Sequence, residues 1–284
     1  MTTIAPLDFA ERYGPWALVL GASEGVGSAF VEALAAQGLN VVLVSRRQEA
    51  LDQVAEKVRA DYGVETRVIA LDLSLANAMQ GLRAALGNLE VGFVVNCAGG
   101  DTGNDHFLDR DLDADEAMLF RNCTLLMRVC HHFGAQMAAR GRGGIVNMSS
   151  GAAVAGTPGL ATYAGTKAFD LLFTEALWGE LKPKGVDVIC LMLADTDTPT
   201  LRRQMLLRGK LTSLEQAPKG ATPAHVVAEE ALRYLGKGPT RVVSRKLRIG
   251  SRVMGFLGRN RAVALMTVAA NKIMGDNRQI VGSD

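Results

Sequence analysis

Three polar residues in the middle of the chain have the types and the spacing needed to move a proton to or from an oxygen atom. Tyr163 and Lys167 lie four residues apart in a segment with helical periodicity, so both side chains project from one face. A free phenol, with a pKa of about 10, exchanges protons poorly near neutral pH, and a neighbouring ammonium favours its phenolate form. Ser150 closes an apolar run thirteen residues before Tyr163, and its hydroxyl can polarise a substrate oxygen. The alternatives are an ordinary helix-face pair and, for the hydroxyl, Ser149.

A glycine-rich turn near the N-terminus forms a second group. Gly21, Gly25 and Gly27 follow the apolar run 16–20 and open the next helical segment. Glycines at this spacing permit a sharp turn, close approach of a pyrophosphate and tight packing of helix on strand, with the phosphates over free N–H groups of the helix. The turn therefore predicts a dinucleotide site. The residues expected to contact the cofactor here are Gly21, Ser23, Glu24, Gly25, Val26 and Gly27.

Two other interpretations of this turn remain open. It could be a βα turn that binds no ligand. Its first five residues, Gly21 to Gly25, also fit the G-x-S-x-G nucleophile elbow of α/β-hydrolases, with Ser23 as the nucleophile. However, that elbow normally follows several strands, and the hydrolase order would require His225 at a helix start.

The end of the second apolar run bears on the choice of cofactor. NAD-binding folds place an acidic residue here to accept a hydrogen bond from the ribose 2′-OH, whereas this chain has Ser45, Arg46 and Arg47 and no carboxylate before Glu49. Two guanidiniums can fork a 2′-phosphate and stack on adenine. We therefore expect NADP(H), the alternative being two solvated surface arginines.

Strand-like and helix-like segments alternate along most of the chain and must position these groups. We expect strands at 16–20, 41–44, 67–71, 92–95, 144–148 and 186–193, and helices at 28–37, 51–62, 113–140, 163–181 and 224–235. Runs of β-branched residues between amphipathic helices indicate strands buried on both faces. The fold class is therefore α/β, a Rossmann-type doubly wound parallel sheet with helices on both faces, forming a single domain with a C-terminal cap.

Composition excludes several classes. The chain of 284 residues is 48% hydrophobic, and its net charge of +2 is typical of a globular protein and not of a nucleic-acid-binding one. Its four cysteines have no zinc-ligand spacing, so we expect reduced thiols and no metal. No apolar run is long enough for a membrane span and no signal peptide is evident, so we expect a cytoplasmic protein.

These motifs together resemble the short-chain dehydrogenase/reductase superfamily over Ala10 to Leu235. The resemblance is carried by the glycine turn, by Ser150 with Tyr-x-x-x-Lys, and by the positions after the strands. It implies catalytic roles for Asn122, Ser150, Tyr163 and Lys167, with Asn122 placing a water of a proton relay and Lys167 also holding the nicotinamide ribose. It further implies cofactor contacts from Asp72 and Leu73 after the third strand and from Asn96, Ala98 and Gly99 after the fourth, where Cys97 replaces the family's second Asn.

Two further runs narrow the resemblance. Phe9 to Ala17 and Leu39 to Arg47 look like the 17β-hydroxysteroid dehydrogenase and very-long-chain 3-ketoacyl reductase subgroup. That subgroup implies hydride transfer between NADPH and a ketone or secondary alcohol on an apolar small molecule. We also expect a homodimer or homotetramer. The alternative from another class is a non-catalytic NADP-binding sensor or scaffold, which would have no need of the acid/base residues.

The segment after the sixth strand departs from the family pattern. Ala194 and Asp195 stand where the family has Pro-Gly, while Thr198 stands where the family has a Thr that contacts the nicotinamide carboxamide. We also expect Thr196 to contact the cofactor. Asp195 either alters how the ring is held or caps the next helix. The apolar residues of about 195–220 fit a lid over an apolar substrate, or ordinary core packing. We assign this lid to a catalytic domain of residues 1–240.

The remainder, 241–284, forms a basic extension. It contains nine Lys or Arg and two Asp or Glu, whereas the whole chain is only +2, so the rest of the chain is net acidic. Its cations alternate with apolar residues in an amphipathic pattern. Such a helix can contact another subunit, form a solvated face, or lie on an anionic membrane.

Overall fold

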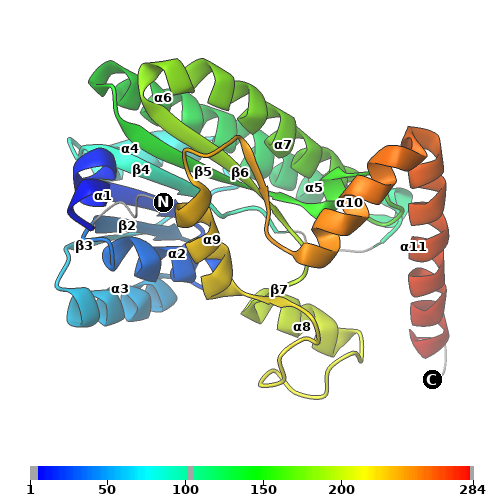
Figure 1. Cartoon of the computed structure of the whole chain (residues 1–284). Coiled ribbons are helices and arrows are strands. Elements are labelled where there is room, and N and C mark those ends of the chain that lie inside the picture. The colour runs from blue at the N-terminus through cyan, green and yellow to red at the C-terminus, as the bar shows by residue number, and fades with distance from the viewer. Residues whose placement is uncertain (1–5, 101–104, 282–284) are drawn as a thin grey trace.

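One parallel sheet organises the chain. The computed structural model describes residues 6–100 and 105–281, and the side chains of 9–100 and 105–271. Seven parallel strands pair in the order β3-β2-β1-β4-β5-β6-β9 (Figure 1). Their bounds are β1 Trp16–Leu20, β2 Asn40–Ser45, β3 Thr66–Ala70, β4 Val91–Asn96, β5 Gly143–Ser150, β6 Val186–Leu193 and β9 Thr240–Val242. This is the doubly wound α/β fold expected from the sequence.

The strands are buried on both sides, as their continuous apolar runs predict. In β1, Ala17 and Val19 pack into one hydrophobic cluster, whereas Leu18 and Leu20 pack into the other. Successive strand residues point to opposite faces, so an unbroken apolar run requires helices on both sides of the sheet.

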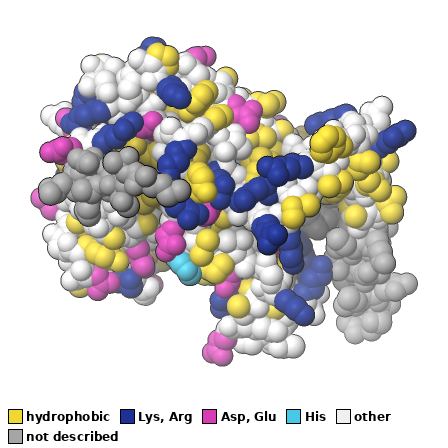
Figure 2. Space-filling model, viewed as in Figure 1, with side chains coloured by type: hydrophobic (Ala, Val, Ile, Leu, Met, Phe, Trp, Pro, Cys, Tyr) yellow, Lys and Arg dark blue, Asp and Glu magenta, His cyan; other side chains and the backbone are white. Residues whose placement is uncertain are grey.

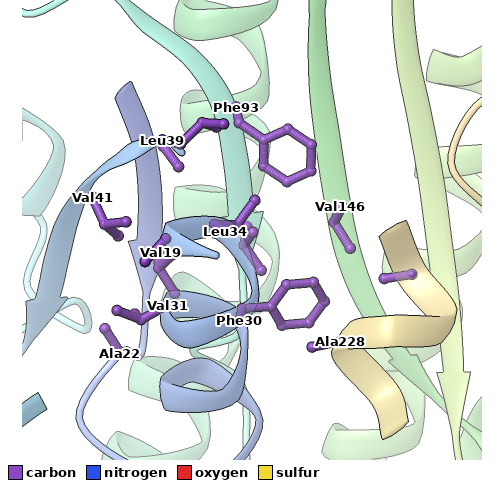
Figure 3. Packing of buried hydrophobic residues seen from close by; sticks show 14 of the residues in the cluster. Val19, Ala22, Phe30, Val31, Leu34, Leu39, Val41, Phe93, Val146 and Ala228 are labelled. Atoms are coloured by element: carbon purple, nitrogen blue, oxygen red, sulfur yellow. The ribbon is translucent and has the colours of Figure 1, made fainter. Parts of the chain in front are cut away.

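Each face of the sheet is covered by its own set of helices. On one face lie α2 Gly25–Ala35, α3 Gln48–Tyr62 and α9 Ala224–Tyr234, and α1 Pro6–Tyr13 contacts β4 and β5. Figure 3 shows Phe30 and Leu34 of α2 close to the sheet residues Phe93 and Val146 and to Ala228 of α9, whereas Val31 lies beside Val19 and Ala22. On the other face lie α4 Ala78–Leu86, α6 Leu126–Arg140 and α7 Ala161–Leu181.

The structure corrects the expected helix at 113–140. The segment divides into α5 Leu112–Leu119, a π-helical turn at Phe120–Leu125 and α6. Hydrophobic periodicity does not reveal a single wide turn, because the residues on either side keep their helical spacing. The sequence also left α1, α4 and β9 unpredicted; all three are short, so they offer little periodicity.

Short elements follow β6. β7 Thr196–Asp197 pairs with β8 Thr222–Pro223, and between them lie α8 Pro199–Leu207 and a loop. The chain ends in α10 Arg245–Leu257 and α11 Arg259–Val281, which join at an angle at one side of the molecule (Figure 1). The sheet order reverses between β1 and β4, and a crevice at the carboxyl ends of such strands is where α/β sheets bind ligands.

Candidate active site

The glycine turn lies at this reversal point. Gly21 has φ +83° and Gly25 has φ +60°, which are left-handed conformations that favour glycine. A Cβ at Gly27 would lie 2.0 Å from the carbonyl oxygen of Gly21, so no side chain fits there. A Cβ at Gly21 would lie 2.9 Å from the amide nitrogen of Ala98, which brings the turns after β1 and β4 into contact.

The N-terminus of α2 can receive an anion. Its N-cap residue, Glu24, makes no side-chain hydrogen bond to the helix, so no side chain of that residue occupies the first N–H groups. Free N–H groups and the helix dipole together stabilise a phosphate. The turn therefore fits the pyrophosphate of a dinucleotide by both its space and its donors.

The predicted phosphate-binding arginines lie beside this turn, both exposed. Arg47 Nη2 donates to Ser23 Oγ at 3.3 Å and to Glu24 Oε2 at 2.6 Å. Ser45 Oγ donates to Ser23 Oγ at 2.9 Å, which ties the end of β2 to the turn. Four residues that the sequence assigned to the cofactor, Ser23, Glu24, Ser45 and Arg47, thus meet in one place, with Arg46 next to them.

Glu24 also connects the turn to α8, a connection that the sequence did not predict. Glu24 Oε1 accepts from Thr200 Oγ1 at 2.8 Å and from Arg203 Nη2 at 2.5 Å. Burial opposes ionisation of this carboxyl, but its hydrogen bonds from Arg203, Thr200 and Arg47 outweigh burial and hold its pKa below the ordinary value. No signal in the sequence could show this pairing, because the partners are nearly 180 residues apart.

The two neighbouring serines at the end of β5 have different environments. Ser149 is 2% exposed and donates to the carbonyl oxygen of Lys167 at 2.7 Å, so its hydroxyl anchors α7. Ser150 is half-buried, and its Oγ accepts from the amide of Ala152 at 3.2 Å. The hydroxyl proton of Ser150 is therefore available for another acceptor, whereas that of Ser149 is donated to the carbonyl oxygen of Lys167.

Tyr163 and Lys167 share one face of α7, as their spacing predicts. The ammonium of Lys167 lies 5.8 Å from the centre of the half-buried Tyr163 ring. A Cβ at Gly99 would lie 2.8 Å from Lys167 Nζ and 3.4 Å from Asn122 Oδ1. The turn after β4, the π-helical turn and α7 therefore converge on the lysine.

Asn122 lies within the π-helical turn and is 1% exposed. Its Nδ2 donates to Thr166 Oγ1 at 3.0 Å, and Thr166 in turn donates to the carbonyl oxygen of Tyr163 at 2.8 Å. A π turn shifts the backbone by one residue and is common at functional sites. It places Asn122 against the stretch of α7 that carries the tyrosine and the lysine.

A buried carboxylate beside Lys167 is the main functional feature that the sequence analysis missed. Lys167 Nζ donates to Asp170 Oδ2 at 2.9 Å and to the carbonyl oxygen of Met148 at 3.0 Å. The side chains of Lys167 and Asp170 are 6% and 1% exposed. The three-residue spacing was a visible signal, since residues three apart on a helix are neighbours.

The pair sets the charge of the site. Burial disfavours the Lys167 ammonium, but the charge of Asp170, with smaller contributions that include its hydrogen bond, outweighs burial and raises the lysine pKa above its ordinary value. Burial likewise raises the pKa of Asp170, against the opposing charge of Lys167. The ammonium beside Tyr163 is therefore held in place by one internal counter-ion.

The remaining residues predicted to contact the cofactor lie around the same edge in different environments. Asp72 accepts from the amide of Ser74 at 2.9 Å, while Leu73 is buried. Asn96 is also buried and donates to Asn147 Oδ1 at 2.6 Å, between β4 and β5. The Asn96 side chain thus points into the interior of the sheet, and its cofactor contact stays a prediction.

The segment after β6 lies against the glycine turn. A Cβ at Gly25 would lie 2.8 Å from Cγ2 of Thr198. Thr198 caps α8 by accepting from the amide of Leu201 at 3.2 Å, and Thr196 Oγ1 donates to Ala194 O at 3.1 Å. The cap of this helix is therefore Thr198, and Asp195 is exposed one position before β7.

Two other kinds of site are absent from the described part of the chain. Within 6–100 and 105–281, no helix is long and apolar enough to cross a bilayer. Over the same part of the chain, no group of three His, Cys, Asp or Glu is arranged to hold a metal ion.

A doubly wound sheet with a glycine turn at its reversal point, with Ser150 at the end of β5 and with Tyr163 and Lys167 on α7, defines a dinucleotide-binding α/β oxidoreductase. The short chain dehydrogenase family matches residues 15–206. The chain belongs to this family, whose members bind a nicotinamide cofactor and act on CH–OH groups. This membership sets aside the hydrolase interpretation of the glycine turn.

Curated relatives include steroid and acyl-CoA enzymes. A 7beta-hydroxysteroid dehydrogenase of Collinsella aerofaciens is 37% identical over 240 residues, which cover 81% of this chain and 86% of the relative. A very-long-chain 3-oxoacyl-CoA reductase of Podospora anserina is 38% identical over 206 residues, which cover 69% of this chain but only 59% of that enzyme. The resemblance to the hydroxysteroid dehydrogenase and ketoacyl reductase group is thereby confirmed.

Solved structures agree with the fold. A structure from work on 7beta-hydroxysteroid dehydrogenase stereoselectivity superposes with a TM-score of 0.82 at 32% identity, covering 91% of this chain and 98% of that one. A short-chain dehydrogenase from Sphingobium yanoikuyae in complex with NADPH has a TM-score of 0.72 at 24% identity, covering 86% and 95%. At that identity, the second comparison supports the fold alone.

Proposed function

We propose that this protein is an NADPH-dependent oxidoreductase that interconverts a ketone and a secondary alcohol on an apolar substrate. The observation that carries the proposal is the convergence of Lys167, Asn122 and the backbone of Gly99 beside Tyr163, at the strand ends next to the glycine turn. When bound, the nicotinamide ring would donate or accept the hydride at the reacting carbon. The chain's own residues would move the proton.

The roles divide among four residues. Tyr163 would donate its phenolic proton to the carbonyl oxygen during reduction and take it back during oxidation. Ser150 would donate a hydrogen bond to the same oxygen and polarise the carbonyl. Lys167 would stabilise the phenolate with its ammonium and contact the ribose, and Asn122 would place the water through which the proton is replaced.

The preference for NADP(H) is supported by charge. Arg46 and Arg47 stand at the end of β2, where a carboxylate would favour NAD. Arg203, a third guanidinium, is held beside the turn by its hydrogen bond to Glu24. Each guanidinium can make two charge-assisted hydrogen bonds to a phosphate. Thr196, Thr198 and the N-terminus of α2 complete the proposed cofactor contacts.

An apolar substrate is supported by the names of the relatives and by the walls of the crevice. The relatives act, by their names, on hydroxysteroids and very-long-chain 3-oxoacyl-CoA. A Cβ at Gly151, the residue after Ser150, would lie 2.8 Å from Leu247 of α10, so an apolar side chain from the C-terminal helices borders the site. An apolar wall at this position favours an apolar ligand.

We also propose the domain division and assembly. Residues 1–240 would form the catalytic domain, with the lid at about 195–220, and 241–284 an extension. The protein would act in the cytoplasm as a homodimer or homotetramer; sedimentation velocity measures the subunit number.

A coupled screen tests the function. We expect NADPH oxidation, followed by absorbance, with steroid ketones and 3-ketoacyl thioesters. Small polar ketones are the control and should be turned over far more slowly, because they leave the apolar wall unfilled. Binding of NADPH without turnover of any ketone would favour the non-catalytic sensor instead.

Replacing Asp170 by Asn tests the buried counter-ion. Without the carboxylate, burial dominates and lowers the pKa of Lys167, so the ammonium is lost at a lower pH. The alkaline limb of kcat/KM against pH should therefore move down by about one unit or more. Asp170→Glu keeps the negative charge, so its alkaline limb should lie close to that of the parent enzyme. An alkaline limb at the same pH in Asp170→Asn would contradict this role.

A further inference from the structure

The outward side of α10 carries both charge and apolar surface. Its exposed residues follow one stripe of the helix and include Arg245, Lys246, Ile249, Arg252, Val253 and Phe256; we call this stripe the α10 outer face. Figure 2 shows basic and apolar side chains gathered over α10. The exposed part of α11 continues the pattern with Arg259, Arg261, Leu265 and Val268.

No acidic residue balances these cations along the chain. The sequence contains no Asp or Glu between Glu230 and Asp276. On many helices a carboxylate three or four residues away pairs with each cation. In α10, and in α11 before Asp276, the sequence offers no such carboxylate. The α10 outer face is therefore a positively charged surface with a strong attraction for an extended anionic partner.

The apolar residues on the same face are unusually exposed. Phe256 is 93% exposed and Val268 is 70% exposed, while Ile249, Val253 and Leu265 are each about half exposed. Aromatic and branched side chains set between cations are the composition of helices that lie in a membrane interface. In such interfacial helices, the apolar side chains enter the boundary between headgroups and acyl chains, and the cations contact lipid phosphates.

The inward side of α10 faces the catalytic crevice. Leu247 borders Gly151, next to Ser150, and Ser244 caps the helix by accepting from the amide of Leu247 at 3.4 Å. Arg259, at the start of α11, donates to the carbonyl oxygen of Val154 in the loop after β5 at 3.4 Å. One helix therefore separates the exposed cationic surface from the site.

We propose that the α10 outer face docks on an anionic phospholipid surface. Docking would place the mouth of the crevice at the lipid boundary, from which an apolar substrate can enter; only this last step rests on the proposed function. A second copy of this chain is a poorer partner. A two-fold contact would set the face against itself, and cations would meet cations.

Vesicle sedimentation of the full-length protein tests the proposal. Vesicles of phosphatidylglycerol mixed with phosphatidylcholine should bind the protein, with an affinity that falls as salt is added, and pure phosphatidylcholine should bind it at least about tenfold less. Equal binding to both vesicles, or none to either, would overturn the proposal.

Paired variants separate this face from general charge. Arg245→Gln with Lys246→Gln should weaken binding about tenfold or more, whereas Lys182→Gln with Lys184→Gln, exposed at the far end of the sheet, should not. Phe256→Ser should weaken binding more than Leu108→Ser, whose side chain is 92% exposed elsewhere. Thermal melting and NADPH oxidation without vesicles should stay unchanged, which shows that the variants fold.

Sedimentation velocity identifies the competing occupant. If the α10 variants alter the subunit number while vesicle binding is unchanged, the face is a contact between copies of this chain and the proposal is wrong. If vesicle binding is lost at constant subunit number, the lipid surface is its partner. If the protein reduces no ketone at all, the vesicle-binding result still stands, and only the proposed function is contradicted.

Discussion

Turnover by Tyr163→Phe is expected to fall by about a thousandfold or more, with NADPH binding nearly unchanged. The substitution removes only the phenolic oxygen, and a positioned acid/base group typically contributes 10²–10⁴-fold. The ring, its place on α7 and the nearby ammonium remain, so the cofactor contacts proposed for Lys167 are retained. Steady-state NADPH oxidation gives the turnover, and quenching of protein fluorescence gives the cofactor affinity.

The matched control is Tyr62→Phe. Tyr62 ends α3 and is 41% exposed, far from the crevice, so loss of its hydroxyl should leave turnover unchanged. Turnover by Tyr163→Phe within tenfold of the parent enzyme would remove this residue from the mechanism.

The second large effect is expected at the end of β2. Arg46→Ala combined with Arg47→Ala should weaken NADPH binding roughly a hundredfold or more, because each guanidinium offers charge-assisted hydrogen bonds to the 2′-phosphate. NADH binding should change little, since NADH has no phosphate at this position. Titration with both cofactors measures the ratio of their affinities directly.

Arg59→Ala is the control for loss of a guanidinium on the same side of the sheet. Arg59 lies on α3 and donates to Thr66 Oγ1 at 2.7 Å, away from the glycine turn. It should not change the ratio of the two affinities. If the double variant weakens NADH and NADPH equally, the arginines bind no 2′-phosphate and the NADP assignment is wrong.

Burial pattern and motif order made the fold predictable. Runs such as Val41 to Val44 are apolar at every position, and a strand needs this pattern only when both of its faces are covered. These runs therefore predicted a doubly wound sheet. The glycine turn and the Tyr163–Lys167 spacing are local, and a helix or turn brings such residues together without help from the rest of the chain. The class of chemistry was therefore already visible in the sequence.

Contacts between distant segments were not visible. The ion pair of Glu24 with Arg203 joins residues nearly 180 positions apart, and the π-helical turn at Asn122 leaves the spacing within each flanking helix unchanged. The path of the chain after β6 likewise depends on pairing of Thr196 with Thr222, two residues with little strand signal of their own.

The sequence alone determined which residues are available for chemistry, because residue type and helical or strand spacing are local properties of the chain. The tertiary structure decided which of those residues meet and how they are charged. Lys167 and Asp170 owe their burial to the packing of α7 on β5 and on the turn after β4, and Ser149 and Ser150 differ only in what surrounds them. Burial and long-range contacts arise only when the whole sheet has formed.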